Sequence, residues 1–281
     1  MNDISFLSGK GCLAAFFKLI SYCRGEILLN QWTDIHSHIL PSVDDGSENL
    51  KQTRNMLKIA HEEGIIHIIA TPHYGVGYIN PDIQELQKKL ELVREEAKKI
   101  DPNFKIDLGN ELYYSEDIIE HLKESKALTM AGTRYVLVEF PVFESFRNIR
   151  TGLHRLLMNG YLPILAHTER YEALYKNFDR IEELIKLGVY IQMNITSILG
   201  GFINKRSRYC KKLMDYGYIH FVATDSHSDH NREPRMIKGV NYLRKKYGIE
   251  LVNQLLVKNT SQLLSNKYLC DEEEEQVYAK Q

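Results

Sequence analysis

The sequence predicts a single-domain α/β protein built as a barrel of parallel strands, and three observations lead to this prediction. Short β-rich runs recur seven times along the 281 residues, and segments with helical apolar spacing lie between most of them. Six of the seven runs finish on a histidine or a carboxylate. Alternating strands and helices fit either a barrel or an open doubly wound sheet, and polar groups at the ends of several different strands favour the barrel, because barrel enzymes gather their sites there.

The predicted strands start as near-continuous apolar runs, as expected for strands of a parallel sheet that is buried on both faces. They cover residues 31–38, 64–73, 104–114, 134–141, 161–169, 188–197 and 218–227. Helical spacing is clearest in residues 49–64 and 81–100. In the second of these segments Leu86, Leu90 and Val93 form one apolar stripe, and Pro81 suits a first helical turn.

We expect the barrel to span residues 32–266, with an N-terminal extension at residues 1–31, either a helix or a tail, and an acidic tail at residues 267–281. The apolar stretch near residues 12–23 is shorter than the roughly 18 residues of a membrane span, and it lacks the cleavage pattern of a secretory signal. The four cysteines contain no CxxC pair, so neither a disulfide framework nor a thiolate zinc site is indicated. These features predict a cytoplasmic protein without a transmembrane segment.

The composition is that of an ordinary globular protein, with 43% hydrophobic and 26% charged residues. The formal net charge is −1. A protein that binds nucleic acid without regard to sequence needs a basic surface, so DNA or RNA is not the expected partner.

The residues at the strand ends are candidate metal ligands. A single histidine or glutamate in such a place is more often only solvated or hydrogen bonded, so the argument depends on their joint occurrence. Residues 36 and 38, and residues 225 and 227, each put two ligand-type side chains on one strand face, because strand side chains alternate with period two. The candidates are His36, His38, His73, Glu111, Glu139, His167, Asp225 and His227, together with one of the adjacent aspartates Asp44 and Asp45.

Other histidines are predicted to be structural or to lie on the surface. His67 shares a strand face with His73, but six residues of strand separate the two by about 20 Å, which places His67 at the opposite end of the barrel. His220 has the same relation to His227. The remaining members of this group lie in helical segments and are His61, His121 and His154, whereas the sequence leaves the role of the loop residue His230 open.

Imidazoles and carboxylates without thiolates suit Mn²⁺, Fe²⁺ or Zn²⁺. Nine candidate ligands are too many for one ion, so two or three ions are predicted, with Glu139 or another carboxylate bridging them. Closely spaced divalent ions typically serve displacement at phosphorus, where they activate a hydroxide and clamp the transferring oxygens. The predicted reaction is therefore hydrolysis of a phosphoester.

Two arginines support a phosphate substrate. Arg170 follows His167 by three residues and Arg232 follows His227 by five, so both belong to loops at the predicted active end. A guanidinium group pairs with phosphate through two parallel hydrogen bonds, although either arginine could instead form a surface ion pair. Asn194 ends the one strand without an ionisable candidate, and we expect it to line the pocket.

Seven motifs in order resemble those of the manganese-dependent tyrosine-protein phosphatases of the polymerase and histidinol phosphatase (PHP) superfamily, which belong to bacterial capsule and exopolysaccharide operons. The resemblance runs from about Asp34 to about Leu264. The motifs are DIHSHILPSVDDGS, ATPHY, GNELYY, VLVEFP, LAHTERY, NITSIL and TDSHS.

This resemblance implies a distorted (β/α)₇ PHP barrel with a trinuclear metal site. It selects Asp45 over Asp44, because the family's aspartate directly precedes the glycine, and it assigns phosphate contacts to Arg170 and Arg232. The implied substrate is the phosphorylated tyrosine cluster at the C-terminus of a bacterial tyrosine kinase that regulates polysaccharide export, which would bring the phosphatase to the membrane through its kinase partner.

Other functions stay open at the level of sequence. A small-molecule phosphomonoesterase of the histidinol-phosphate phosphatase type would use the same metals, and a scaffold could bind the kinase without chemistry. The complete ligand set argues against the scaffold, and the net charge argues against a PHP-type nuclease. A thiol-based tyrosine phosphatase is excluded, because none of the cysteines is followed six positions later by arginine.

Overall fold

The computed structural model describes residues 31–201 and 203–269 as one α/β unit whose strands all pair in parallel. The predicted extension, apart from Gln31, and most of the predicted acidic tail lie outside these residues. Among the described helices, none has both the length and the apolar character needed to cross a membrane.

Nine strands occur in the described part of the chain, in place of the seven predicted from the sequence. Three of them form one sheet in the order β1-β2-β4. The other six form a second sheet in the order β3-β5-β6-β7-β8-β9. The strands are β1 (Trp32–Ser37), β2 (Ile65–Ala70), β3 (His73–Gly75), β4 (Lys105–Leu108), β5 (Glu111–Tyr113), β6 (Tyr135–Glu139), β7 (Leu162–Leu165), β8 (Tyr190–Asn194) and β9 (Phe221–Ala223).

The prediction of continuous strands at 64–73 and 104–114 was wrong, because each of these runs breaks into two strands. The first breaks at Thr71 and Pro72 and the second at Gly109 and Asn110. Proline has no N–H for a ladder hydrogen bond, and its carbonyl instead accepts from Asn110 Nδ2 at 2.9 Å and from Glu111 N at 3.1 Å. The break moves the chain from the first sheet to the second, where it continues as β3 and β5.

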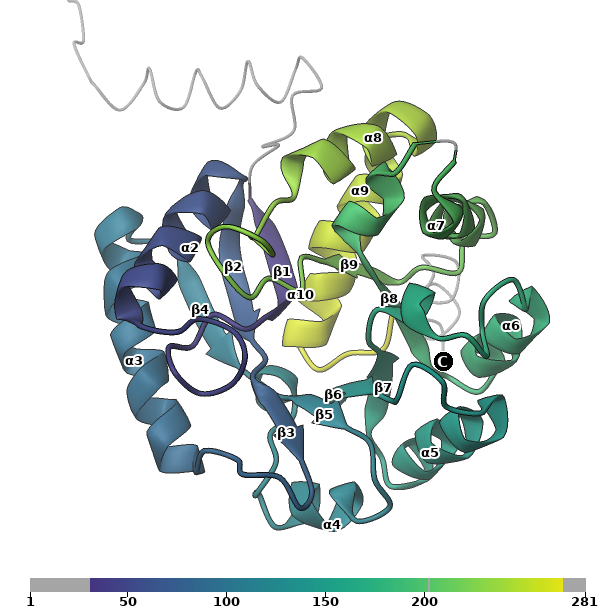
Figure 1. Cartoon of the computed structure of the whole chain (residues 1–281), viewed down its shortest axis with the longest axis horizontal. Coiled ribbons are helices and arrows are strands. Elements are labelled where there is room, and N and C mark those ends of the chain that lie inside the picture. Colours follow the sequence, from purple (N-terminus) through teal and green to yellow (C-terminus); the bar gives the residue numbers. More distant parts are fainter. Residues whose placement is uncertain (1–30, 202, 270–281) are drawn as a thin grey trace, which may run out of the picture.

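Backbone hydrogen bonds also join the first and last strands, β1 and β9, at their carboxyl ends. Asp225 N donates to His36 O at 2.9 Å, and His38 N donates to Ser226 O at 2.8 Å. The strands therefore follow one another around a ring, as the barrel prediction requires. Figure 1 shows this ring with helices on its outside.

The outer helices follow the strands as predicted. They are α2 (Leu50–Glu62), α3 (Ile83–Ile100), α4 (Ile118–Lys123), α5 (Phe146–Met158), α6 (Phe178–Lys186), α7 (Lys205–Asp215) and α8 (Ile237–Tyr247), with short 3₁₀ turns at Met130–Gly132, Thr168–Arg170 and Ile195–Leu199. In α3 the stripe of Leu86, Leu90 and Val93 is buried, as predicted. Asp82 caps this helix by accepting from Glu85 N at 2.7 Å, so Pro81 lies just before the cap rather than in the first turn.

Two apolar cores hold the layers together. The larger lies between strands and helices, and the smaller gathers residues from β1, β2, β6, β7 and β9, including Ile35, Ile69 and Phe221. Side chains that meet from strands all around the ring fill its interior, as in other α/β barrels. The interior is thus a packed core rather than a channel.

The C-terminal helices close the amino end of the ring. They are α9 (Ile249–Asn253), a π-helical turn at Gln254–Lys258 and α10 (Asn259–Leu264). Leu263 of α10 packs into the inner core. Asn259 Nδ2 donates to His220 O, just before β9, at 2.7 Å, and Arg134 N, just before β6, donates to Asn266 Oδ1 at 2.9 Å. In Figure 1 α10 lies at the centre of the ring, so the opposite, carboxyl end is the one left for a site.

Candidate metal centre

The carboxyl end of the ring brings together all nine side chains that the sequence analysis selected as candidate metal ligands. Eight of them fall into three sets of three or four residues, and within each set the ligand atoms lie within 4.8 Å of one another. The ninth, His167, joins through its Nε2 atom, which lies 2.8 Å from Glu111 Oε1 and 3.4 Å from Glu139 Oε2.

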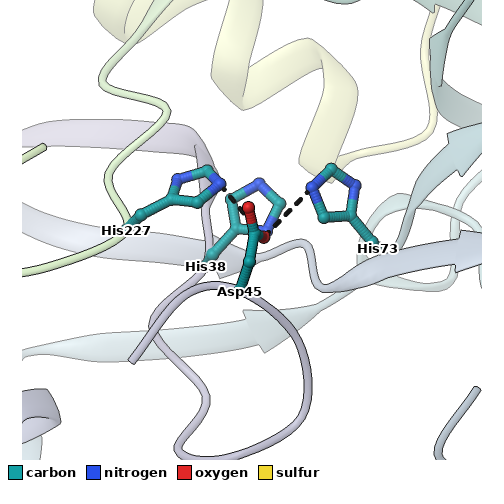
Figure 2. Close-up of side chains that lie close together, drawn as sticks. All are labelled: His38, Asp45, His73 and His227. Carbon is teal, nitrogen blue, oxygen red and sulfur yellow. Dashed lines mark ion pairs between the residues drawn. The ribbon is translucent and has the colours of Figure 1, made fainter. Parts of the chain in front are cut away.

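The first set consists of His38, Asp45, His73 and His227. Figure 2 shows the Asp45 carboxylate between the rings of His73 and His227, with His38 beside it. Asp45 Oδ1 lies 3.3 Å from His73 Nε2 and 3.4 Å from His227 Nε2. Three imidazoles and a carboxylate are enough donors for one divalent ion.

The other two sets share members with the first. The second contains His36, His38, Glu111 and Asp225, and the third contains His73, Glu111 and Glu139. Glu111 Oε2 lies 3.1 Å from His36 Nε2, 3.2 Å from His38 Nε2 and 3.3 Å from His73 Nδ1. Because each pair of sets shares one residue, the arrangement suits closely spaced ions. Glu111, which belongs to two sets, has the position expected of a bridging carboxylate, whereas Glu139 belongs to one.

The two adjacent aspartates lie in the loop after β1 and have different roles. The side chain of Asp44 is buried, and its carboxylate accepts from His38 Nδ1 at 2.7 Å and from His73 N at 3.0 Å. Asp45 points into the first set instead. Gly46 lets the loop approach closely, because a Cβ there would lie 2.2 Å from His38 O. The sequence analysis missed the role of Asp44, and the signal that could have revealed it was the doublet itself.

Hydrogen bonds from Nδ1 orient three of the histidines so that Nε2 faces the cluster. His38 donates to Asp44, His36 Nδ1 lies 3.4 Å from Gln192 Oε1, and His227 Nδ1 lies 3.1 Å from the carbonyl of Asp225. An imidazole that donates from one nitrogen presents the lone pair of the other, which is the usual arrangement of metal-binding histidines. The donor set therefore fits divalent cations.

Two of the candidate ligands have a strained backbone. His167 has a φ of 29° and Asp225 a φ of 53°, in a region that residues other than glycine rarely adopt. His167 N donates to Gln192 Oε1 at 2.6 Å, and Asp225 N donates to His36 O at 2.9 Å, which holds both conformations. Strain of this kind collects at functional sites, where it fixes a side-chain direction that a regular strand would not give.

The electrostatics of the cluster favour positive charge. Burial would lower the pKa of His38, but hydrogen bonds to Asp44 and Glu111 outweigh it and raise this pKa to about 9. Burial would also lower the pKa of His73, but hydrogen bonds to Asp45 and Glu139 outweigh it and raise this pKa to about 11. The pKa of Glu111 lies well below its ordinary value, because the neighbouring histidines outweigh its burial. Such a collection of carboxylates attracts protons or metal cations alike.

The family described as "Capsular polysaccharide synthesis, CpsB/CapC" matches residues 32–265. The chain belongs to this family. The resemblance stated from the sequence is thereby confirmed.

Its relatives include named tyrosine-protein phosphatases. CpsB of Streptococcus agalactiae is 34% identical over 241 residues, covering 84% of this chain and 99% of the relative. CpsB of Streptococcus pneumoniae is 33% identical over 244 residues, with the same shares covered. YwqE of Bacillus subtilis is 29% identical over 234 residues, covering 83% of this chain and 92% of the relative.

Solved structures agree on the fold. A crystal structure from work on YwqE of Bacillus subtilis and CpsB of Streptococcus pneumoniae, described as metal-dependent tyrosine phosphatases, superposes with a TM-score of 0.76 at 28% identity, covering 84% of this chain and 95% of the other. Histidinol phosphate phosphatase of Lactococcus lactis matches with a TM-score of 0.53 at 16% identity, over 77% of this chain and 94% of that one, and shares the fold.

In this CpsB/CapC chain the two predicted phosphate-binding arginines lie at the edge of the cluster. Arg170 Nη2 lies 2.5 Å from Asp225 Oδ2, and Arg232 Nη2 lies 2.6 Å from Asp225 Oδ1. Asn194, predicted to line the pocket, is buried and donates from Nδ2 to the same carboxylate at 2.7 Å. It thus fixes Asp225 rather than facing a substrate.

The remaining histidines lie as the sequence analysis expected. His67 pairs with Asp107 at 2.8 Å, His61 with Asp101 at 3.2 Å, and His220 Nδ1 accepts from Ile191 N at 3.0 Å. His121 contacts the Tyr74 hydroxyl at 2.7 Å. His154 lies in α5, and the undecided His230 is exposed beside Asp229 at 3.1 Å.

Proposed function

We propose that this CpsB/CapC chain is a metal-dependent phosphotyrosine-protein phosphatase. The observation that carries the proposal is the single cluster of five imidazoles and four carboxylates, eight of which fall into three overlapping sets that His167 joins through Glu111. A phosphate monoester carries its negative charge on oxygens that a group of adjacent cations can contact together. The structurally related YwqE and CpsB are described as metal-dependent tyrosine phosphatases, which agrees with such a site.

The proposed metal ligands are the nine residues selected from the sequence. They are His36, His38, Asp45, His73, Glu111, Glu139, His167, Asp225 and His227. Nitrogen and oxygen donors suit Mn²⁺, which we propose as the resident ion in two or three copies, with Fe²⁺ and Zn²⁺ as the alternatives that a metal analysis would distinguish. When bound, such ions supply Lewis acidity that offsets the charge of the phosphoryl oxygens.

The protein's own groups position the substrate and the ligands. We propose that Arg170 and Arg232 turn from Asp225 toward the phosphate, since a guanidinium group matches two phosphate oxygens as well as it matches a carboxylate. Asp44, Gln192 and Asn194 keep His38, His36 and Asp225 in place through the hydrogen bonds described above. These contacts fix the ligand geometry before the substrate arrives.

The proposed substrate is the phosphorylated C-terminal tyrosine cluster of a bacterial tyrosine kinase that controls capsular or exopolysaccharide synthesis. An extended, flexible segment can reach a site formed by loops at the rim of a barrel. The proposed place of action is the cytoplasm, at the membrane where the kinase partner brings the enzyme.

Metal analysis and substrate comparison test the proposal together. Purified protein is assayed for bound metals by mass spectrometry, and turnover of a phosphotyrosine peptide and of histidinol phosphate is measured with added Mn²⁺ and with EDTA. We expect two or three equivalents of metal, preference for the peptide, and loss of turnover in EDTA. Preference for histidinol phosphate would show a small-molecule phosphatase, and activity that survives EDTA would refute the metal centre.

A further inference from the structure

A cleft of about 330 Å³ opens directly beside the metal centre. His73 and Glu139 line one part of it, and Val43, Tyr78, Ile79 and Tyr113 line much of the rest. His73 and Glu139 are also among the accessible members of the cluster, with side chains 35% and 17% exposed, whereas His36 and Glu111 are buried. A ligand in this cleft therefore reaches the cluster at an edge that solvent can enter.

The loop between β3 and α3 holds one wall of this cleft in place. Asn80 Nδ2 donates to Gly75 O at 2.8 Å and to Tyr78 O at 3.1 Å, and Asn80 Oδ1 accepts from Gly75 N at 3.0 Å. A Cβ on Gly75 would lie 2.6 Å from Tyr78 Cδ2, so the tyrosine ring packs where only glycine leaves room. Gly77 has a φ of +82°, which completes the turn.

This fixed loop presents apolar side chains to solvent. Tyr78 is 66% exposed and Ile79 is fully exposed. The Tyr113 ring lies 5.9 Å from the Tyr78 ring, centroid to centroid, at an angle of 59°. The three side-chain hydrogen bonds of Asn80 hold this exposed aromatic surface next to the polar cluster. Because such surface is stabilised only when a ligand or partner covers it, the arrangement indicates a binding role.

We propose that Tyr78 and Tyr113 form an aromatic slot that binds the phenyl ring of an aryl phosphate, with the phosphate directed to the cluster at the His73 and Glu139 end. The inference rests on the proposed function and specifies how the site selects phosphotyrosine. A ring in the cleft lies against two aromatic side chains and Val43, whereas an alkyl phosphate leaves this surface exposed. The slot thus selects aryl phosphates over alkyl phosphates.

The test compares binding and turnover in four proteins: wild type, Tyr78→Ala, Tyr78→Phe and the control Tyr216→Ala. Tyr216 is another exposed tyrosine, and it follows α7 at the opposite end of the barrel. Binding of phenylphosphonate and of methylphosphonate to the Mn²⁺-loaded proteins is measured by calorimetry, and hydrolysis of a phosphotyrosine peptide is measured in parallel.

Tyr78→Ala is expected to weaken phenylphosphonate about tenfold and to raise the peptide KM about tenfold, since a lost aromatic pair has roughly that effect. Methylphosphonate binding and kcat should change little, and Tyr78→Phe and Tyr216→Ala should behave like wild type. Equal loss for both phosphonates, or none for either, overturns the slot. If wild type binds phenylphosphonate through Tyr78 but hydrolyses no phosphotyrosine, the proposed function fails while the slot stands.

Discussion

The two ends of the barrel use the same residue types in opposite ways. At the amino end, His67 has Asp107 as a carboxylate partner at 2.8 Å, and the aspartate side chain is 37% exposed. At the carboxyl end, Glu111 is buried and lies within 3.3 Å of His36, His38 and His73. Asp107 also lies 3.4 Å from Arg94 Nη2, so nearby cationic groups balance its charge, whereas the cluster gathers four carboxylates around shared histidines and therefore suits added cations. The candidate metal centre is distinguished by carboxylates that several histidines share, and not by the mere presence of histidine.

The largest expected effect comes from removing a shared histidine. His38→Ala takes one donor from two of the three sets, so we expect kcat/KM on a phosphotyrosine peptide to fall on the order of 10³-fold or more while the fold persists. His67→Ala, at the other end, should retain near wild-type kcat. Steady-state kinetics together with circular dichroism checks both. Full activity in His38→Ala would contradict the assignment of the metal ligands.

A smaller effect is expected from the residue that orients this histidine. Asp44→Asn weakens the hydrogen bond to His38 Nδ1 without removing a proposed ligand, and changes of this kind typically cost 10- to 100-fold in metal affinity or activity. Excess Mn²⁺ should restore much of the activity, which it should not do for His38→Ala. Titration of activity against Mn²⁺ concentration distinguishes the two. A metal dependence equal to that of wild type would remove Asp44 from this role.

The arginines give the next test. Arg170→Lys keeps a positive charge but loses the planar fork, so we expect the KM of a phosphotyrosine peptide to rise roughly tenfold at unchanged metal content. Arg54→Lys, in the ion pair with Glu96 on the outer helices, is the matched control and should leave KM unchanged. The assay measures KM together with bound metal. A loss of metal in Arg170→Lys would assign the arginine to the cluster's structure instead of to the substrate.

Much of this arrangement could be predicted from the sequence, because it depends on periodicity. Alternation along a strand puts residues 36 and 38 on one face, and the carboxyl ends of parallel strands meet at one rim, so convergence of the candidate ligands followed. The breaks at Thr71 and Gly109 could not be predicted from periodicity, since they depend on how the chain passes from the first sheet to the second. The roles of Asp44 and Asn194 likewise depend on three-dimensional contacts, which place one beside His38 and the other beside Asp225.

The smallest expected effect belongs to the partly exposed pair of His67 and Asp107 at the amino end. The hydrogen bond from His67 is the main cause that lowers the pKa of Asp107 below its ordinary value of 3.8, so the ionised carboxylate is favoured in the folded state. Its contribution is present above that value and is lost as the pH falls below it, because the unfolded chain then binds the proton more readily. For a partly exposed pair the contribution to the free energy of unfolding is about 0.5–1 kcal/mol.

Asp107→Asn should therefore lower the free energy of unfolding by about this amount at pH 7 and by less at pH 3. Urea denaturation, followed by the fluorescence of the single tryptophan, Trp32, measures both values. Activity should be unchanged. A loss of activity equal to that of Asp44→Asn would show that the two ends are coupled, and the contrast between them would then fail.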